Sequence, residues 1–479
     1  MRVPDFLYQS AQRWPDNPAI IDEWGALTYA QLETLVMEMA VNLKMLGITP
    51  QSGVAVIGRN SRYFIAQCFA VMECSAVVLP LSNQIKTDEM DEIIRTAGLQ
   101  AVLDDHTSMI HFTNTQKLIR LPHQDWRFVF LNHAETDKPY VPHVKNPAFI
   151  RFTSGTTGSA KGIILSHQSI AERTESTHKI LQLGPQDTVV WVLSMAYHFV
   201  VSIILYLRYG CCIMLCDEFL AETIIDNTNR HKATFLYCSP MHIRLLANDK
   251  SYRKMPSLRY AISTSVSISR EQCQAFFNRF GIPVSQAYGI IEIGLPVINF
   301  GKNKESPEAI GFALPDYQVQ IRDDNDTVLP PGETGNLLIR GPGMLDAYLY
   351  PPRCRTEILD NGWFHTGDLA SINDDGLIRI EGRKKSMINV SGNKVFPEEV
   401  EAVLNQHPAV KVCRVSGFMH AFLGERVQAD IVLTNEPEQF EPEELITFCR
   451  KRLSLYKIPQ KITIVESLPI TYSEKLVRY

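Results

Sequence analysis

The chain has 479 residues, of which 45% are hydrophobic and 21% charged, the composition of an ordinary globular protein with room for about two to four domains. The net charge is -5 at pH 7 without a long basic run, so we expect no nucleic-acid partner. The ten cysteines lack the paired spacing of a metal site, which predicts reduced core thiols and a cytoplasmic protein.

Predicted helices and strands alternate along the first half of the chain. Strands are expected at 53–58, 76–80, 101–103, 189–193, 212–215 and 234–237, and helices at 29–46, 61–72, 86–97, 169–181, 199–209 and 221–230. Such alternation predicts parallel sheets covered by helices. The apolar segment 189–215 is interrupted by His198, Arg208 and Gly210, so we expect a buried helix and strand there and no membrane span.

From about residue 310 the pattern changes to short strands and turns. Asp-Asp-Gly at 374–376 is a hairpin signal, and this section is expected to be a small β-barrel or a distorted sheet. After Lys385 the alternation returns, with helices at 397–405 and 442–453 and strands at 410–417 and 428–433. The sequence therefore predicts an α/β protein that ends in an α+β section.

The most informative motif is a loop rich in glycine and hydroxyl groups, Phe-Thr-Ser-Gly-Thr-Thr-Gly-Ser-Ala-Lys-Gly at 152–162. Glycine lets the backbone turn its N–H groups inward, and Ser154, Thr156 and Thr157 add hydroxyl donors. Lys161 adds a positive charge, so the loop suits the polyphosphate tail of a nucleoside triphosphate. Apolar runs on both sides predict two buried strands joined by a tight turn rather than a flexible linker.

This loop differs from the P-loop of common nucleotide hydrolases, which reads G-x-x-x-x-G-K-[ST]. Counted from Gly155, Ala160 stands at the position of the second glycine. Gly162 follows Lys161 where a magnesium-binding hydroxyl is needed. The P-loop interpretation is therefore excluded.

Four further motifs follow the loop. Tyr288 and Gly289 offer a flat face to a nucleobase, and the nearby Glu292 can hold a metal ion. The run 362–368 ends in Asp368, and an aspartate at a turn can accept two ribose hydroxyls. The last two are the run 382–392, with Arg383 near its start, and the run 469–475, which ends in Lys475.

In this order the five motifs resemble the adenylate-forming (AMP-binding) superfamily, which contains acyl-CoA synthetases, adenylation domains of peptide synthetases and beetle luciferases. The resemblance extends from Leu27 to Lys475. It implies an AMP-forming acid–thiol ligase, in which a carboxylate attacks the α-phosphate of ATP and a thiol then takes the acyl group from the adenylate. It also implies a large N-terminal domain (1–384) of two helix-covered sheets plus the small β-barrel, and a small mobile α+β C-terminal domain (385–479) that turns about a hinge at Lys385.

The resemblance also implies roles for single residues. Lys475 and Glu292 are the catalytic residues: Lys475 bridges the carboxylate and the α-phosphate, and Glu292 binds magnesium. The nucleotide is held by Tyr288 and Gly289 at adenine, by Asp368 and Arg383 at ribose, and by Thr153, Ser154, Gly155, Thr156, Thr157, Gly158 and Lys161 at the phosphates.

Three positions depart from the family pattern. Ala160 replaces a proline, which affects only the rigidity of the loop. Ile291 replaces a threonine and removes a hydroxyl beside Glu292. Glu474 replaces the glycine before Lys475, and our hypothesis is that it weakens adenylation without abolishing it.

The acid pocket is expected around the run Leu-Ser-Met-Ala-Tyr-His-Phe at 193–199, where Tyr197 stands at the position of a usual histidine and His198 follows. His198 is either a packed histidine bonded to a carbonyl or a polar contact to the substrate. No aspartate occurs between residues 193 and 202, which disfavours α-amino acids. The added bulk of the side chains expected to line this pocket favours a short acyl or aryl acid over a long fatty chain. The expected pocket residues are Tyr197, His198, Ser263, Ile290 and Gly294.

The implied cofactors are ATP, Mg²⁺ and CoA, and the implied partner is a small carboxylic acid. The phosphopantetheine of an acyl or peptidyl carrier protein is an alternative acceptor, and the family base rate favours CoA. A weakly catalytic adenylate-binding protein is a third possibility, which Ile291 and Glu474 permit. The sequence offers no special support for a luciferase-like oxygenase.

Overall fold

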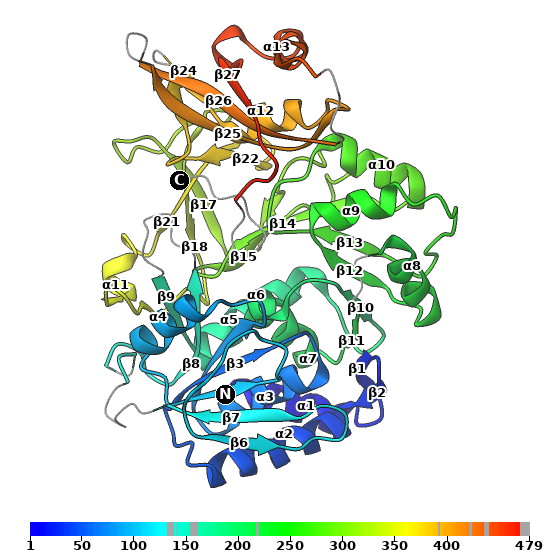
Figure 1. Ribbon diagram of the computed structural model, residues 1–479, viewed down its shortest axis with the longest axis vertical. Helices are drawn as coiled ribbons and strands as arrows, with labels where there is room; N and C mark the ends of the chain where they lie inside the picture. The colour runs from blue at the N-terminus through cyan, green and yellow to red at the C-terminus, as the bar shows by residue number, and fades with distance from the viewer. Residues whose placement is uncertain are drawn as a thin grey trace. The chain divides into compact units, whose positions relative to one another are not determined.

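The computed structural model describes residues 1–131, 138–140, 142–153, 161–216, 220–390, 393–420, 424–434 and 440–469 (Figure 1). The chain divides into two compact units. Unit 1 contains residues 1–318 and 340–364, and unit 2 contains residues 319–339 and 365–479.

A nine-stranded sheet with a parallel centre forms one half of unit 1. Its order is β20-β19-β9-β8-β4-β3-β5-β7-β6. The apolar runs flanking the loop form the two strands expected there, β8 and β9, which pair antiparallel. Residues 54–57 of β3 are fully buried, which explains the continuous apolar run in the sequence. The strands are β3 (Gly53–Gly58), β4 (Val77–Ser82), β5 (Ala101–Asp104), β6 (Gln116–Ile119), β7 (Trp126–Phe130), β8 (Pro147–Thr153), β9 (Lys161–Ser166), β19 (Ala347–Tyr348) and β20 (Arg353–Cys354).

A second nine-stranded sheet forms the other half of unit 1, in the order β16-β15-β14-β13-β12-β10-β11-β1-β2. Strands β1, β11, β10, β12, β13 and β14 pair in parallel, whereas β15 returns antiparallel to β14. The strands are β1 (Pro18–Asp22), β2 (Gly25–Thr28), β10 (Thr188–Trp191), β11 (Cys212–Leu215), β12 (Phe235–Cys238), β13 (Tyr260–Ser263), β14 (Val284–Ile290), β15 (Gly294–Ile298) and β16 (Phe312–Ala313).

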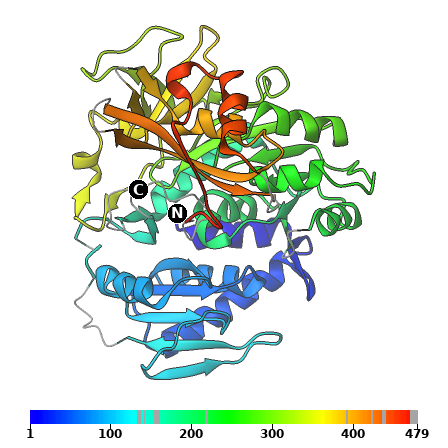
Figure 2. The ribbon, with the colours of Figure 1, turned by 45° about the horizontal axis from the view of Figure 1, so that its top comes forward.

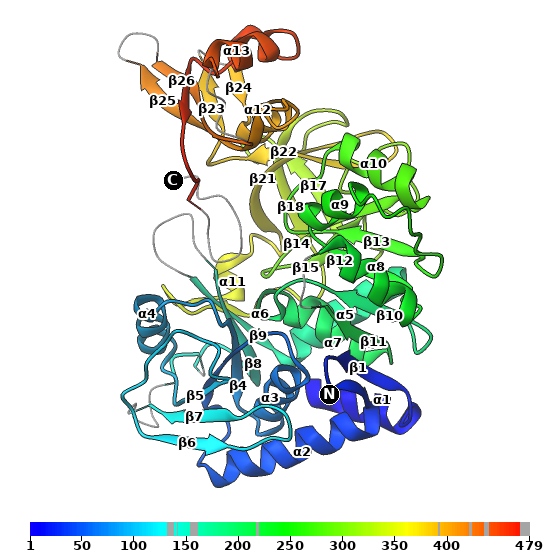
Figure 3. The same ribbon diagram turned by 45° about the vertical axis from the view of Figure 1, so that its right-hand side comes forward.

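Helices cover both sheets, and α5 contacts both of them, through β8 and β9 of the first and β15 of the second. Figure 2 shows the blue helices of the first hundred residues packed along the cyan strands, and Figure 3 shows α8 and α9 beside β12 and β13. Thr28, Ser61 and Ser166 cap the starts of α2, α3 and α5 with their hydroxyls. The helices are α1 (Val3–Arg13), α2 (Tyr29–Met45), α3 (Arg62–Glu73), α4 (Thr87–Ala97), α5 (His167–Leu181), α8 (Ala221–Arg230), α9 (Pro240–Ala247), α10 (Arg270–Phe280) and α11 (Arg355–Ile358).

The helix expected at 199–209 begins earlier than predicted and is not a regular α-helix. It starts as α6 (Met195–His198), continues as a π-helical stretch (Phe199–Ile203) and ends as α7 (Ile204–Arg208). The start is held by Asn60, whose side chain bonds Leu193 O at 2.8 Å and Met195 N at 2.9 Å. Among the described residues, no helix has the length and apolarity needed to cross a membrane.

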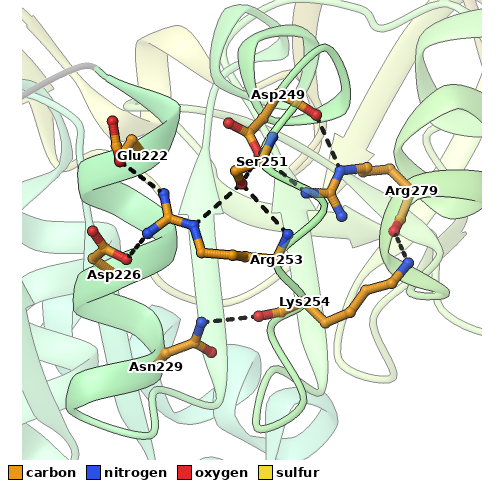
Figure 4. A network of polar contacts seen from close by, with 8 residues as sticks. All are labelled: Glu222, Asp226, Asn229, Asp249, Ser251, Arg253, Lys254 and Arg279. Carbon is orange, nitrogen blue, oxygen red and sulfur yellow. Dashed lines mark hydrogen bonds and ion pairs between the residues drawn. The ribbon is translucent and has the colours of Figure 1, made fainter.

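A polar network fixes the connection between α9 and β13 (Figure 4). Arg253 forms ion pairs with Glu222, at 3.1 Å, and with Asp226, both on α8. Arg279 of α10 pairs with Asp249 at 3.0 Å. The Arg253 pairs join the connection to α8 and the Arg279 pair joins it to α10. The Arg253 pairs are solvent-exposed and contribute little stability each.

In its described residues, unit 2 has three small sheets and two α-helices. The section predicted to be a small barrel or distorted sheet is a four-stranded sheet in the order β17-β18-β21-β22, and the Asp-Asp-Gly turn joins β21 to β22 as expected. Two further sheets, β23-β24 and β25-β26-β27, pack with the helices around their own apolar core. The elements are β17 (Gln318–Arg322), β18 (Gly335–Arg340), β21 (Phe364–Ile372), β22 (Ile378–Arg383), β23 (Ile388–Val390), β24 (Asn393–Val395), α12 (Pro397–Leu404), β25 (Val410–His420), β26 (Gly424–Leu433), α13 (Pro442–Arg450) and β27 (Lys461–Ile464).

The α/β fold class is therefore confirmed, with two helix-covered sheets followed by a smaller α+β section. The domain boundary at 384/385 and the hinge at Lys385 stay predictions. Lys385 lies exposed in the turn between β22 and β23.

Candidate active site

Glu292 lies at the tip of the hairpin between β14 and β15 in unit 1. Its Oε1 accepts a hydrogen bond from the Tyr348 hydroxyl at 3.4 Å, and its backbone oxygen accepts one from Leu345 N at 2.7 Å. Burial raises the pKa of the Glu292 carboxyl above its usual range, while the nearby Arg151 and Tyr348 favour the charged form. The carboxylate is thus partly shielded from water, and its negative charge is compensated in part by these neighbouring groups.

Two glycines fix the shape of this hairpin. A side chain at Gly289 would place its Cβ 2.2 Å from the Gly294 carbonyl oxygen, so only glycine fits. Gly294 has φ +81°, a conformation that favours glycine, and it lies against Arg173. Ile290 pairs with Gly294 across the hairpin. Gly289, Ile290 and Gly294 therefore form the turn that presents Glu292.

Arg173 of α5 is buried and forms a hydrogen bond to the same hairpin. Its Nη1 donates to Ile291 O at 3.0 Å, and its Nε donates to Gly343 O at 2.9 Å. Burial lowers the pKa of Arg173 to about 10. The side chain of Ile291 is only 7% exposed, so the position where the family pattern has a threonine is an apolar part of this turn.

Lys161, the first residue of β9, lies near Glu292. Its Nζ is 4.9 Å from the centre of the Tyr348 ring, a cation–π distance. Tyr348 belongs to β19, which pairs antiparallel with β9, so sheet register brings the ring to Lys161. Lys161 also favours the charged form of Glu292. The structure thus brings together two residues predicted from separate motifs.

Arg151 of β8 is the second cation near Glu292. Its Nη1 donates to the backbone oxygen of Tyr197, and its Cζ lies 5.1 Å from the centre of the Tyr197 ring. Its Nε is buried and meets no acceptor among the described residues. Burial lowers the pKa of Arg151 to about 10, and Glu292 opposes this shift.

The predicted pocket residues Tyr197 and His198 both lie on α6. The His198 ring meets Trp191 and Tyr237 edge to face, with ring centres 6.0 and 5.9 Å away. His198 is thus part of an aromatic cluster, and the choice between a packing role and a substrate contact stays a prediction. Ser263 ends β13 with a hydroxyl that is buried and has no partner among the described residues.

The predicted ribose residues lie together in unit 2. Asp368 and Arg383 face each other in the β21–β22 pairing, and Arg383 Nε lies 3.2 Å from Asp368 Oδ1. Asp368 lies within β21 rather than at a turn, because Gly367, with φ +78°, and a bulge after Leu369 bend the strand without ending it.

For the other predicted nucleotide-binding and catalytic residues, the structure gives only a position in a strand or no description. Tyr288 lies half-buried on β14. Thr153 ends β8, and its side chain is not described. The following predicted residues lie outside the described part of the chain: Ser154, Gly155, Thr156, Thr157, Gly158 and Lys475, together with the departures Ala160 and Glu474.

Sequence reasoning missed Arg151, Arg173 and Tyr348. Arg151 left one signal, because it is a lone charge inside the apolar run Ala-Phe-Ile-Arg-Phe at 148–152. Nothing in the local sequence marks Arg173 or Tyr348, which reach the hairpin through helix packing and strand pairing.

Comparisons with known proteins show which proteins this chain resembles. The feruloyl-CoA synthase of an Amycolatopsis species is 24% identical over 477 residues, covering 98% of this chain and 96% of that protein. The long-chain-fatty-acid–CoA ligase of Escherichia coli O6:H1 is 26% identical over 522 residues, covering 99% and 93%. The solved structure of the o-succinylbenzoate-CoA synthetase of Bacillus subtilis with its acyl-adenylate intermediate shares the fold, with a TM-score of 0.86, 23% identity and coverage of 99% and 97%.

Two family models also match the chain. Residues 399–475 match the AMP-binding enzyme C-terminal domain, and residues 7–349, which include Arg151, Lys161, Glu292 and Tyr348, match the AMP-binding enzyme family. Since this match spans most of the chain, the protein belongs to the AMP-binding enzyme family.

Proposed function

We propose that the protein joins a carboxylic acid to the thiol of CoA in two steps. The acid attacks the α-phosphate of ATP to give an acyl-adenylate and pyrophosphate, and the CoA thiol then takes the acyl group and releases AMP. The observation that carries this proposal is the Glu292 carboxylate, whose charged form burial disfavours and the nearby Arg151 and Lys161 favour. Such a site can offset the repulsion between two reacting anions. The names of the relatives, feruloyl-CoA synthase and long-chain-fatty-acid–CoA ligase, support the same chemistry.

The described residues fit the proposed ligands. Glu292 is a partly buried carboxylate of the kind that holds Mg²⁺, which would neutralise phosphate charge. Lys161 borders the glycine-rich loop and would contact the phosphates. The Asp368 carboxylate, 5% exposed and paired with Arg383, would accept ribose hydroxyls, and Tyr288 would stack on adenine. We assign the α-phosphate contact to Lys475.

The proposed acid is a short acyl or aryl acid. The support is the aromatic cluster of His198 and the buried hydroxyl of Ser263, which can bond a polar substituent. One buried methylene changes specificity by only about 1–3 kcal/mol, so the acid has to be found by experiment. A cytoplasmic location is proposed because none of the ten thiols is disulfide-bonded.

The test is pyrophosphate exchange with a panel of aryl, short-chain and long-chain acids, with mass spectrometry of the acyl-adenylate. At least one acid is expected to drive exchange and then give an acyl-CoA. If a phosphopantetheinylated carrier protein is acylated and CoA is not, the carrier protein is the acceptor. Absence of exchange with every acid would contradict the proposal and favour an adenylate-binding protein with little catalysis.

A further inference from the structure

Arg151 is a charged residue inside an apolar strand. Its neighbours on β8, Ile150 and Phe152, pack into the core of the first sheet. Because successive side chains of a strand face opposite sides, Arg151 points to the other face, where α6 carries Tyr197. Arg151 is partly buried, and removing a charged group from water is costly, so an arginine at this position calls for an explanation.

The guanidinium of Arg151 has unused donor capacity. Of its five N–H groups, one donates to the Tyr197 oxygen, and no other acceptor lies within bonding distance among the described residues. The Nε–H is buried as well as unpartnered. Buried donors in native proteins find acceptors, and an acceptor that arrives with a ligand satisfies this requirement.

The groups around Arg151 indicate which kind of ligand it can bind. Arg151 and Lys161 both favour the charged form of the Glu292 carboxylate, so two cations lie near this one anion. A desolvated positive charge attracts an anion. Lys161 adjoins the glycine-rich loop and lies over Tyr348, whereas Arg151 stacks on Tyr197 of α6, the segment expected to line the acid pocket. The two cations therefore have different neighbours and suit different anions.

We propose that Arg151 binds the reacting carboxylate of the acid substrate; this inference rests on the proposed function. A guanidinium presents a planar fork that matches a carboxylate. While Arg151 holds the carboxylate, an oxygen lone pair forms the new bond to the α-phosphorus. The bond from that phosphorus to the pyrophosphate oxygen breaks, and its electron pair leaves with pyrophosphate, so no proton moves. Arg151 lowers the repulsion between the two anions as they approach.

Kinetics of the variants Arg151→Gln and Arg151→Lys test the assignment. Arg151→Gln is expected to raise KM for the acid at least about tenfold, the effect of losing one charge-assisted hydrogen bond. KM for ATP is expected to stay within about twofold, and Arg151→Lys to recover part of the loss. The matched control is Arg208→Gln, because Arg208 likewise donates to a backbone oxygen, of Ala171, and lies over a tyrosine ring, of Tyr209. This control is expected to leave both KM values unchanged.

Binding without ATP separates this inference from the proposed function. We would compare the thermal shifts that benzoate, cinnamate and butyrate give with those of the uncharged amides of the same acids. The acids are expected to stabilise the wild type more than the amides do, and Arg151→Gln is expected to remove the difference. An equal shift for acid and amide in the wild type, or the same acid shift in both proteins, would overturn the inference. Wild-type protein that binds the acids but forms no adenylate would refute the proposed function alone.

Two kinetic outcomes would also overturn it. An increase in KM for ATP alone would make Arg151 a phosphate contact. An increase in KM for dicarboxylic acids alone would make Arg151 a contact to a second acidic group of the substrate.

Discussion

The hydroxyl of Tyr348 donates to Oε1 of Glu292 at 3.4 Å, while the face of the same ring lies 4.9 Å from Lys161 Nζ. One tyrosine thus orients the proposed magnesium ligand and supports the proposed phosphate-binding lysine. The arrangement depends on the pairing of β19 with β9, which links the chain around residue 348 to the edge of the glycine-rich loop.

Tyr348→Phe is expected to weaken magnesium binding. The variant keeps the ring under Lys161 but removes the donor that orients Glu292, and loss of such a partner lowers metal affinity about tenfold or more. The measurement is adenylate formation as a function of MgCl₂ concentration, in which the half-saturating concentration should rise by that factor. The control Tyr140→Phe removes a hydroxyl that bonds Gln51 O at 2.9 Å and should leave the magnesium dependence unchanged. The same magnesium dependence in Tyr348→Phe and wild type would contradict the assignment.

Gly289→Ala is expected to destabilise the Glu292 hairpin. Its Cβ would meet the Gly294 oxygen at 2.2 Å, and forcing such an overlap costs about 3 kcal/mol. Chemical unfolding followed by circular dichroism measures this loss. In the control Gly184→Ala the new Cβ meets Oε1 of Gln186, the movable end of an exposed side chain. Equal stability of the two variants would show that the hairpin tolerates a side chain.

His167→Asn is expected to flatten the pH dependence of stability. His167 Nδ1 accepts a hydrogen bond from Val3 N at 3.1 Å, and burial, with Arg2 nearby, lowers the pKa of His167 to about 4. The unfolded chain therefore binds a proton that the folded chain does not between pH 6.5 and about 4. Stability is full above pH 6.5, and about 3 kcal/mol is lost as the pH falls to about 4.

The measurement for His167 is urea unfolding of wild type and His167→Asn at about pH 7 and about pH 4.5. Asparagine can still accept from Val3 N but does not titrate, so the wild type should lose more stability between the two conditions. Parallel losses in both proteins would show that His167 carries no such linkage.

Lys475→Ala is expected to reduce adenylate formation by about 100-fold or more, the effect of losing one charge that stabilises the transition state. Transfer of acyl groups from a supplied acyl-adenylate to CoA should remain, because that step does not bring two anions together. Lys461→Ala, which removes an exposed lysine of β27, is the control. Normal adenylate formation by Lys475→Ala would remove this lysine from the mechanism.

Lys385→Pro tests the proposed hinge. Proline fixes φ near −65° and restricts the residue before it, so the two half-reactions should be affected unequally, by about tenfold or more if domain rotation between them is required. Lys385→Ala removes the charge without this restriction and should retain both. Equal loss of both half-reactions in Lys385→Pro would argue against a hinge at this residue.

The sequence by itself determined the local elements, because hydrophobic periodicity and turn residues act over a few positions. The run Gly-Val-Ala-Val-Ile-Gly is β3 at the predicted residues, and the apolar runs on both sides of the glycine-rich loop are β8 and β9. The irregular helix after Met195 was harder to predict, since its start depends on Asn60, a residue from a distant segment.

Only the tertiary structure decided which groups surround Glu292. Arg151, Tyr348 and Arg173 come from β8, β19 and α5, and they meet at one hairpin through strand register and helix packing. Contacts between segments far apart in the chain leave no local periodicity to read. The motifs therefore indicated the chemistry, while the packing of two sheets around α5 set the charge balance at the site.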